Sequence, residues 1–171
     1  MSSIPKTLLH TSTHRPMRAL GQWHRAVGEK PFIERDEAGR DDLIALRSTL
    51  IAEEVQEALE ALLNYRKAQI MDDFIESSPT SVFLPGRGES APEGPRWYEA
   101  LAKELADVLY VVYGTADLLE IPLEAVFAEV HRSNMSKVVD GKVTRREDGK
   151  VLKPATYREA DVHGALTGEW L

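Results

Sequence analysis

Apolar residues recur every three or four positions along four stretches of the chain, a spacing typical of amphipathic helices. The first stretch covers about 15–27 and ends near Gly28, with Pro31 following as a stop signal. The second covers about 41–67, where Asp41 or Asp42 could cap the helix start. Its apolar stripe contains Leu43, Leu46 and Leu50. Residues 68–76 could extend this helix or form a short helix of their own.

Two further helices and a turn-rich tail complete the pattern. The third helix is expected over about 97–119, with an apolar stripe that includes Leu101, Val108 and Val111. The fourth is expected to start at Pro122, a favoured first-turn residue, and to run to about residue 137. The tail, 138–171, holds two Asp-Gly turns, and residues 142–146 and 150–153 could pair as a small hairpin. The pattern therefore predicts an all-α fold with a short C-terminal hairpin or turn-rich tail.

Residues 77–96 interrupt the helical pattern. This stretch holds four prolines, three glycines and four serines, a composition that does not propagate a helix. Loops of this length in a compact domain are usually functional or disordered. We interpret it as a long exposed loop that forms a lid or an oligomer contact.

Length, charge and composition narrow the class of protein. A chain of 171 residues predicts a single domain, 1–171, and the absence of cysteine excludes disulfides and thiolate chemistry. The net charge of −7 argues against nucleic-acid binding through broad electrostatics. No signal-peptide core or apolar run of membrane-spanning length, roughly 20 residues, is present. We expect a cytoplasmic protein with neither nucleic acid nor membrane as a partner.

Carboxylates occupy the inward stripes of the second and third helices. Glu53, Glu54 and Glu57 continue the stripe of the second helix, and Glu104 and Asp107, three residues apart, share the stripe of the third. Such a cluster would repel itself unless divalent cations bind it, and Mg²⁺ or Mn²⁺ prefers oxygen ligands. The alternative is that both acidic runs are simply solvated helix faces. The pattern favours a metal site that supports phosphoryl or nucleotidyl transfer to water.

The acidic runs also resemble a known signature. Residues 46–57 followed by Glu104-Leu105-Ala106-Asp107 are similar to the E-E-x-x-E…E-x-x-D motif of MazG-like nucleotide pyrophosphohydrolases. That superfamily of all-α NTP pyrophosphatases includes dimeric dUTPases and phosphoribosyl-ATP pyrophosphatases. Residues 133–137 resemble the Asn-x-x-Lys segment of the family, and residues 148–154 the tail of a MazG-like subgroup. The resemblance covers about 22–157, although the loop makes the gap between Glu57 and Glu104 wider than in most members.

The resemblance implies a fold, an activity and a set of roles. It implies a four-helix-type bundle, assembled as a homodimer or homotetramer, that cleaves a nucleoside triphosphate, with dUTP or dCTP as candidates, to a monophosphate and pyrophosphate. Glu53 would orient or deprotonate the attacking water. Asn134 and Lys137 would contact the nucleotide or its phosphates. The metal ligands for Mg²⁺ or Mn²⁺ would be Glu54, Glu57, Glu104 and Asp107.

Further residues are candidates for substrate binding. Lys150 and Lys153 belong to a tail, 137–158, with seven basic residues against three acidic ones, which suits a triphosphate; the alternative is a solvated hairpin edge. Trp23 and His24 could supply a stacking surface for the base. A core position explains Trp23 at least as well, and a polar boundary position explains His24 better than a role as a ligand. Arg47 could contact substrate or hold a carboxylate in place.

Three alternatives to a triphosphate pyrophosphohydrolase stay open at this point. The first is a phosphoribosyl-ATP pyrophosphatase, for which the chain is long. The second is a di-iron bundle, which needs Glu-x-x-His on two helices; Glu129-Val130-His131 is the nearest sequence and has the wrong spacing. The third is a non-catalytic helical module that binds nucleotides.

Overall fold

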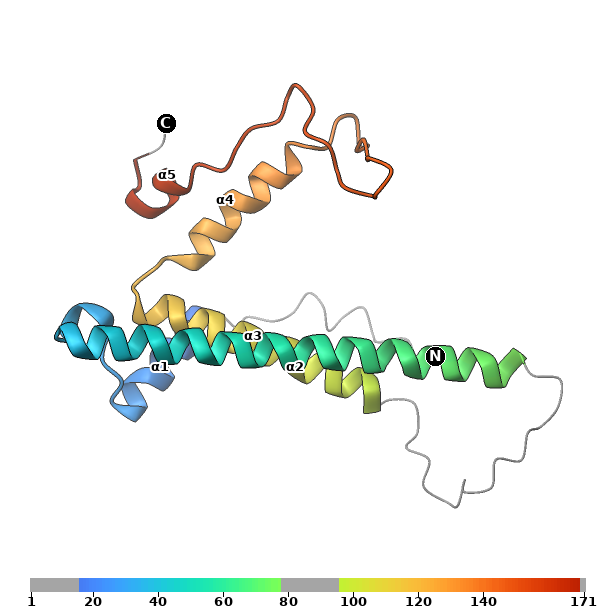
Figure 1. Cartoon of the computed structure of the whole chain (residues 1–171). Helices are drawn as coiled ribbons and strands as arrows, with labels where there is room; N and C mark the ends of the chain where they lie inside the picture. Colours follow the sequence, from blue (N-terminus) through green and yellow to red (C-terminus); the bar gives the residue numbers. More distant parts are fainter. Residues whose placement is uncertain (1–15, 78–95, 170–171) are drawn as a thin grey trace, which may run out of the picture. The chain divides into compact units, whose positions relative to one another are not determined.

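A computed structural model describes residues 16–77 and 96–169, with side chains described for all of these except 71–77 and 96 (Figure 1). Helices dominate these residues, as the all-α prediction requires. The elements are α1 (Pro16–Val27), the short 3₁₀ helix η2 (Phe32–Glu34), α2 (Glu37–Ser77), α3 (Arg96–Leu118), α4 (Leu123–Met135) and α5 (Val162–Thr167). The predicted loop, 77–96, lies outside the described residues except at its two ends.

The chain divides into two compact units. Among the described residues, one unit combines 16–33 with 116–169, and the other comprises 34–77 and 96–115. The first contains α1, α4, α5 and the tail, whereas the second contains α2 and most of α3. None of the helices in the described residues combines the length and apolar content that crossing a bilayer requires. The single-domain organisation stays a prediction.

The start of α2 differs from the sequence-based expectation. The helix begins at Glu37 rather than near residue 41, and Asp36 accepts a hydrogen bond from the Gly39 amide at 2.9 Å through Oδ1. The Asp36 carbonyl accepts the first bond of the helical ladder, from the Arg40 amide. Asp36 therefore provides the cap that was expected from Asp41 or Asp42, because it precedes the first turn. Residues 68–76 extend α2 and do not form a separate helix.

Within their unit, α2 and α3 run antiparallel and side by side (Figure 1). Near the N-terminal end of α2, Arg47 contacts Val111 and Thr115 on α3. Further along α2, the ring of Tyr65 lies 6.3 Å from that of Tyr98. Residues later in α2 therefore contact residues earlier in α3, as an antiparallel arrangement requires. This register is what brings position 54 opposite positions 104–107.

The buried side of this pair follows the predicted stripes only in part. Leu43 on α2 and Leu101 and Val111 on α3 are buried, but Leu46 is 52% exposed. Burying side chains of this size is worth roughly 1.5–3 kcal/mol each, so the three buried residues stabilise the fold.

The helix α4 buries polar groups where its apolar residues would be expected. Phe127 is 66% exposed, whereas Glu129 and Ser133 are buried. Pro122 stands just before the helix, at its N-cap, and not in its first turn. In the tail, antiparallel bridges join Val139 to Lys142 and Arg145 to Val151, so the short hairpin and turn-rich character are confirmed.

The buried Glu129 makes the stability of this unit sensitive to acid. Its carboxylate accepts two hydrogen bonds from Arg132 and one from the Asp161 amide, and these lower its pKa from 4.5 to about 2. Because the pKa is lower in the folded state, the stabilisation is present above about pH 4.5 and is lost as the pH falls toward 2. We expect the difference in Tm between the wild type and Glu129→Gln to shrink over that range. A difference independent of pH would contradict this assignment.

Candidate active site

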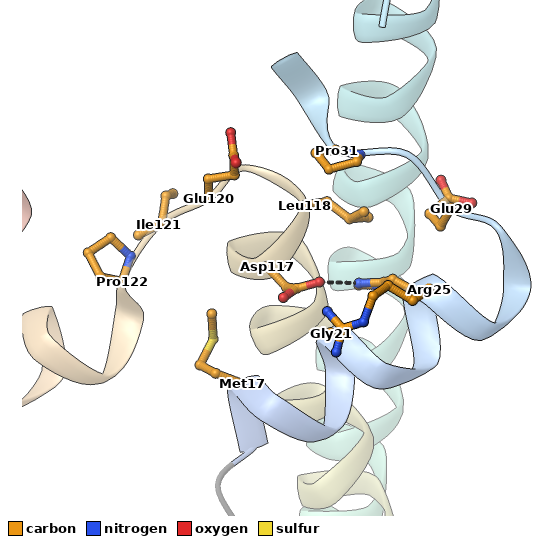
Figure 2. Close-up of a pocket in the computed structure, with 11 residues that line it drawn as sticks. Met17, Gly21, Arg25, Glu29, Pro31, Asp117, Leu118, Glu120, Ile121 and Pro122 are labelled. Carbon is orange, nitrogen blue, oxygen red and sulfur yellow. Dashed lines mark hydrogen bonds and ion pairs between the residues drawn. The ribbon is translucent and has the colours of Figure 1, made fainter. Parts of the chain in front are cut away.

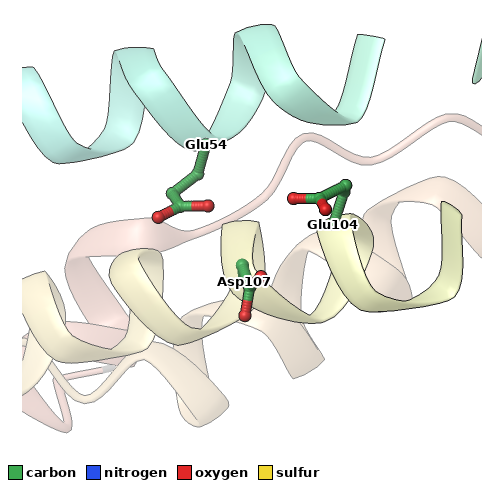
Figure 3. Close-up of side chains that lie close together, drawn as sticks. All are labelled: Glu54, Glu104 and Asp107. Carbon is green, nitrogen blue, oxygen red and sulfur yellow. The ribbon is translucent and has the colours of Figure 1, made fainter. Parts of the chain in front are cut away.

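Three of the predicted acidic ligands come together between α2 and α3 (Figure 3). Glu54 points from α2 toward α3, and Glu104 and Asp107 lie one turn apart on α3. One carboxylate oxygen from each lies within 4.8 Å of the other two, and all three side chains are half-buried. Spacing alone does not bring acids together across two helices. The antiparallel register and the shared inward stripes do so.

Glu104 has an unsatisfied oxygen at the centre of this cluster. Its side chain is 16% exposed; Oε1 accepts a bond from Lys103 Nζ at 3.2 Å, but Oε2 is buried and has no hydrogen-bond partner among the described residues. A buried carboxylate oxygen without a partner is costly, because it has lost its water and gained nothing in exchange. A cation is the kind of ligand that would satisfy it, and the all-oxygen donor set fits Mg²⁺ or Mn²⁺.

The fourth predicted ligand, Glu57, is exposed and lies outside this group of three. The negative charge of Glu104, and next that of Glu54, raises its pKa, so it lies within the electrostatic field of the cluster. Glu53, the predicted base, is also exposed. Both glutamates are therefore open to solvent beside the cluster.

A lysine that the sequence reasoning missed partly neutralises the acids. Lys103 Nζ lies 2.6 Å from Asp107 Oδ2 and 3.2 Å from Glu104 Oε1. Its hydrogen bond to Asp107 is the main reason that its pKa is raised, so the ammonium stays charged. An i,i+4 search of α3 for ion pairs would have found the Lys103–Asp107 pair.

Replacing Lys103 by methionine is expected to strengthen the binding of divalent cations several-fold. The ammonium competes with a cation for Asp107 and Glu104, and its removal leaves the cluster more negative. The same change should lower Tm without metal, because repulsion among the acids is then uncompensated. Metal titration and melting curves with and without Mg²⁺ measure both effects. Weaker metal binding in the variant would contradict the competition.

Arg47 ties the two helices together close to the cluster. Its Nη2 donates to the Val111 carbonyl at 2.8 Å, and its Nε donates to Thr115 Oγ1 at 3.0 Å. It lies two turns before Glu54 on the same side of α2, so these bonds fix the helix register on which the cluster depends. Contact of Arg47 with substrate stays a prediction.

The acidic cluster lies inside a recognisable family segment. Residues 22–134, about two thirds of the chain, match the phosphoribosyl-ATP pyrophosphohydrolase family. The chain belongs to this family. The family is part of the all-α NTP pyrophosphatase, or MazG-like, superfamily, as the acidic motifs predicted. A comparison with curated proteins gave no match.

Membership of the phosphoribosyl-ATP pyrophosphohydrolase family establishes the class of reaction. The protein is a hydrolase that acts on the phosphoanhydride bond of a nucleotide. The matched segment contains all five acidic candidates and ends at Asn134. Lys137, Lys150 and Lys153 lie beyond it. The family name corresponds to the phosphoribosyl-ATP pyrophosphatase, which the sequence left open as an alternative to a triphosphate pyrophosphohydrolase.

The candidates on α1 have different surroundings from those expected. Trp23 is 52% exposed, which removes its interpretation as a core residue. His24 is buried, and its Nδ1 lies 2.6 Å from Asp117 Oδ2 on α3. Asp117 is half-buried, and its contact holds His24 in place. No sequence pattern could find this pair, because its members are 93 residues apart.

A pocket of about 390 Å³ opens beside the His24–Asp117 pair (Figure 2). Arg25 and Gly21 face Asp117 from α1, and Ile121 and Pro122 form another part of the lining. A Cβ atom at Gly21 would lie 2.9 Å from Asp117 Oδ1, so a larger residue there would displace this carboxylate oxygen. The pocket is within one unit, and substrate contacts for Trp23 and His24 stay predictions.

The basic candidates gather around the end of α4 and the tail. Lys137 Nζ donates to Asn134 Oδ1 at 2.7 Å, and Lys153 Nζ lies 3.2 Å from Glu159 Oε1. Both lysines line a second pocket, of about 420 Å³. Lys150 is exposed and is not among its lining residues. A substrate contact for Lys150 stays a prediction.

Proposed function

We propose that this protein is a metal-dependent nucleoside triphosphate pyrophosphohydrolase that releases pyrophosphate and leaves the monophosphate. The observation that supports metal dependence most directly is the buried, unpartnered Oε2 of Glu104 inside a cluster of three carboxylates. Glu54, Glu104 and Asp107 would hold Mg²⁺ or Mn²⁺, with Glu57 completing the set. A bound divalent cation would polarise the phosphoryl oxygens and neutralise their charge.

The side chains of this chain supply the remaining roles. Glu53, exposed next to Glu54, accepts the proton of a water molecule that attacks the α-phosphorus. The oxygen of that water forms the new bond to phosphorus, and the bond between this phosphorus and the α–β bridging oxygen breaks. Pyrophosphate departs with the bridging oxygen. Asn134 and the lysines of the tail, among them Lys137, Lys150 and Lys153, hold the phosphate groups through charge-assisted hydrogen bonds.

A second substrate is favoured by the family to which the chain belongs. Phosphoribosyl-ATP carries a triphosphate like that of ATP, so the same acids and the same bond cleavage would serve it. The substrates differ at the base and at the additional ribosyl phosphate, not at the reacting phosphorus. We propose an NTP or dNTP, including dUTP and dCTP, and phosphoribosyl-ATP as the two candidate substrates.

We propose further that the protein acts as a homodimer or homotetramer. Val55, Leu59 and Leu62 follow one side of α2 at spacings of four and three, and Leu105 and Leu109 form a similar row on α3. These five side chains are 40–57% exposed, and apolar rows of this extent usually mark a protein interface. Light scattering should give a mass of two or four chains, and Leu59→Glu should reduce it. A monomeric wild type would contradict the proposal.

The test of the function is a product assay on the purified full-length protein. All NTPs, all dNTPs and phosphoribosyl-ATP are incubated with Mg²⁺ or Mn²⁺, and pyrophosphate is resolved from single phosphate. Pyrophosphate release that stops on chelation supports the proposal, and the preferred nucleotide decides between the two substrates. Release of single phosphate, or turnover that survives chelation, would overturn it.

A further inference from the structure

A lysine-lined pocket lies in the unit that contains α4 and the tail. Its volume is about 420 Å³, and three lysines and a threonine are among the residues that line it. Lys137 follows the end of α4, Lys142 belongs to the first bridge with Thr144 just after it, and Lys153 follows the second bridge. Val143 and Leu152 supply apolar lining. Three segments of the tail thus contribute lysines to the lining of one cavity.

Two of these lysines share an aromatic ring. Lys153 Nζ lies 4.3 Å, and Lys137 Nζ 5.7 Å, from the centre of the Tyr157 ring. Cation–π contacts at these distances hold both ammonium groups near the same ring and leave their remaining N–H groups available. Their other partners are Asn134 and Glu159. Among the described residues, no hydrogen bond or ion pair engages the ammonium of Lys142.

A network of hydrogen bonds around the buried Glu129 holds the segment that follows Tyr157. Glu129 accepts hydrogen bonds from Arg132 at 2.6 and 2.8 Å and from the Asp161 amide at 2.7 Å. Arg132 also donates to the Glu159 carbonyl at 2.8 Å, so one carboxylate and its partner fix both ends of residues 159–161. Loss of either partner of such a bond destabilises the fold, because the other partner is left buried without a hydrogen bond.

Ser133 of α4 and Ser136, which caps the end of that helix, extend these contacts toward Tyr157. Ser133 Oγ donates to the Arg158 carbonyl at 2.8 Å and lies 3.3 Å from the Tyr157 hydroxyl. Ser136 Oγ accepts a bond from the Arg158 amide at 2.9 Å. The buried side of α4 therefore sets the position of Tyr157, and Tyr157 sets the positions of Lys137 and Lys153.

We propose that this pocket binds the phosphate groups of the nucleotide or of pyrophosphate without the help of a divalent cation, with Lys142 as its third cationic contact, and that Glu129 is a positioning residue that keeps the pocket assembled. The inference rests on the proposed function for Lys137 and Lys153. Three lysines and a threonine in the lining of one cavity suit a group with several oxygen acceptors. Glu159 is the acidic group that a phosphate must displace from Lys153.

The experiment is calorimetric titration of pyrophosphate into the full-length protein in the presence of EDTA. Wild type should bind, and Lys142→Met should weaken binding about 10-fold, the scale of one hydrogen bond to a charged group. Lys142 is exposed, so this change should leave folding intact. The matched control is Lys67→Met, an exposed lysine on α2 in the other unit, which should bind like wild type.

Glu129→Gln tests the positioning role, with Glu124→Gln, an exposed glutamate on the same helix, as its control. Hydrogen exchange should speed up at the Asp161 and Arg158 amides, pyrophosphate binding should weaken, and KM for the nucleotide should rise more than kcat falls. Faster exchange with unchanged pyrophosphate affinity and KM would show that Glu129 has only a structural role, and would overturn the proposal that it positions the pocket.

The outcomes also separate this inference from the proposed function. Metal-dependent pyrophosphate release by the enzyme, together with no binding of pyrophosphate in EDTA or equal binding by Lys142→Met, would overturn the pocket and leave the function standing. Lys142-dependent binding in a protein that hydrolyses no nucleotide would support the pocket and overturn the function.

Discussion

Glu104→Gln is expected to lose pyrophosphate release and the stabilisation by Mg²⁺, yet to melt at the same temperature as wild type or higher when metal is absent. The substitution removes one negative charge from a cluster whose buried Oε2 has no partner, and the amide oxygen can still accept from Lys103. Activity should fall by more than the roughly 100-fold that loss of a group supporting a metal ligand costs, because Glu104 would itself be a ligand.

The measurement combines an activity assay with melting curves in EDTA and in Mg²⁺. At a metal concentration 100 times Kd, binding stabilises a folded protein by about 2.7 kcal/mol, and the variant should lose most of that gain. Glu99→Gln, an exposed glutamate in the first turn of α3, serves as the matched control. A variant that keeps the Mg²⁺-dependent rise in Tm would exclude Glu104 as a ligand.

Glu53→Gln should show the complementary result, with metal binding retained and chemistry lost. Glu53 is exposed beside the cluster and is not one of its three convergent carboxylates. Removal of a general base typically lowers kcat by about 10²- to 10⁴-fold, and a glutamine in its place cannot accept the proton. The stabilisation by Mg²⁺ should stay near the wild-type value. Single-turnover rates and melting curves together test this assignment.

The control for Glu53 is Glu60→Gln on the same helix, where Glu60 is exposed and accepts a hydrogen bond from Gln56. That variant should keep full activity. If Glu53→Gln loses the metal-dependent rise in Tm as well as activity, Glu53 is a metal ligand and another group is the base.

The helices and the acidic cluster could be predicted from the sequence because both depend on local periodicity. Leu101, Glu104 and Val111 share one side of α3 by spacing alone, and Glu54 lies on the stripe that begins at Leu43. The helix boundaries were less predictable, since Asp36 and not Asp41 or Asp42 caps α2. A capping residue is chosen by the backbone geometry of the preceding turn, and several nearby acids satisfy the same rule.

Contacts between residues far apart in the chain could not be predicted from the sequence. The hydrophobic pattern of α4 favours burial of Phe127, but Glu129 is buried instead because Arg132 and an amide 32 residues away satisfy it. His24 and Asp117 pair for a similar reason. From the sequence alone, an acidic side chain is expected to lie at the surface. Only the tertiary structure shows the partner that allows it to be buried.

Lys103 has a consequence for how the enzyme would respond to its surroundings. Its ammonium stands where it partly compensates Glu104 and Asp107, so the acids do not require a cation in order to coexist in a folded chain. Removal of the metal should therefore stop catalysis without causing the protein to unfold or to be degraded by proteases. The supply of free Mg²⁺ would then set the rate of hydrolysis and leave the abundance of the protein unchanged, and activity would return as soon as the ion is restored.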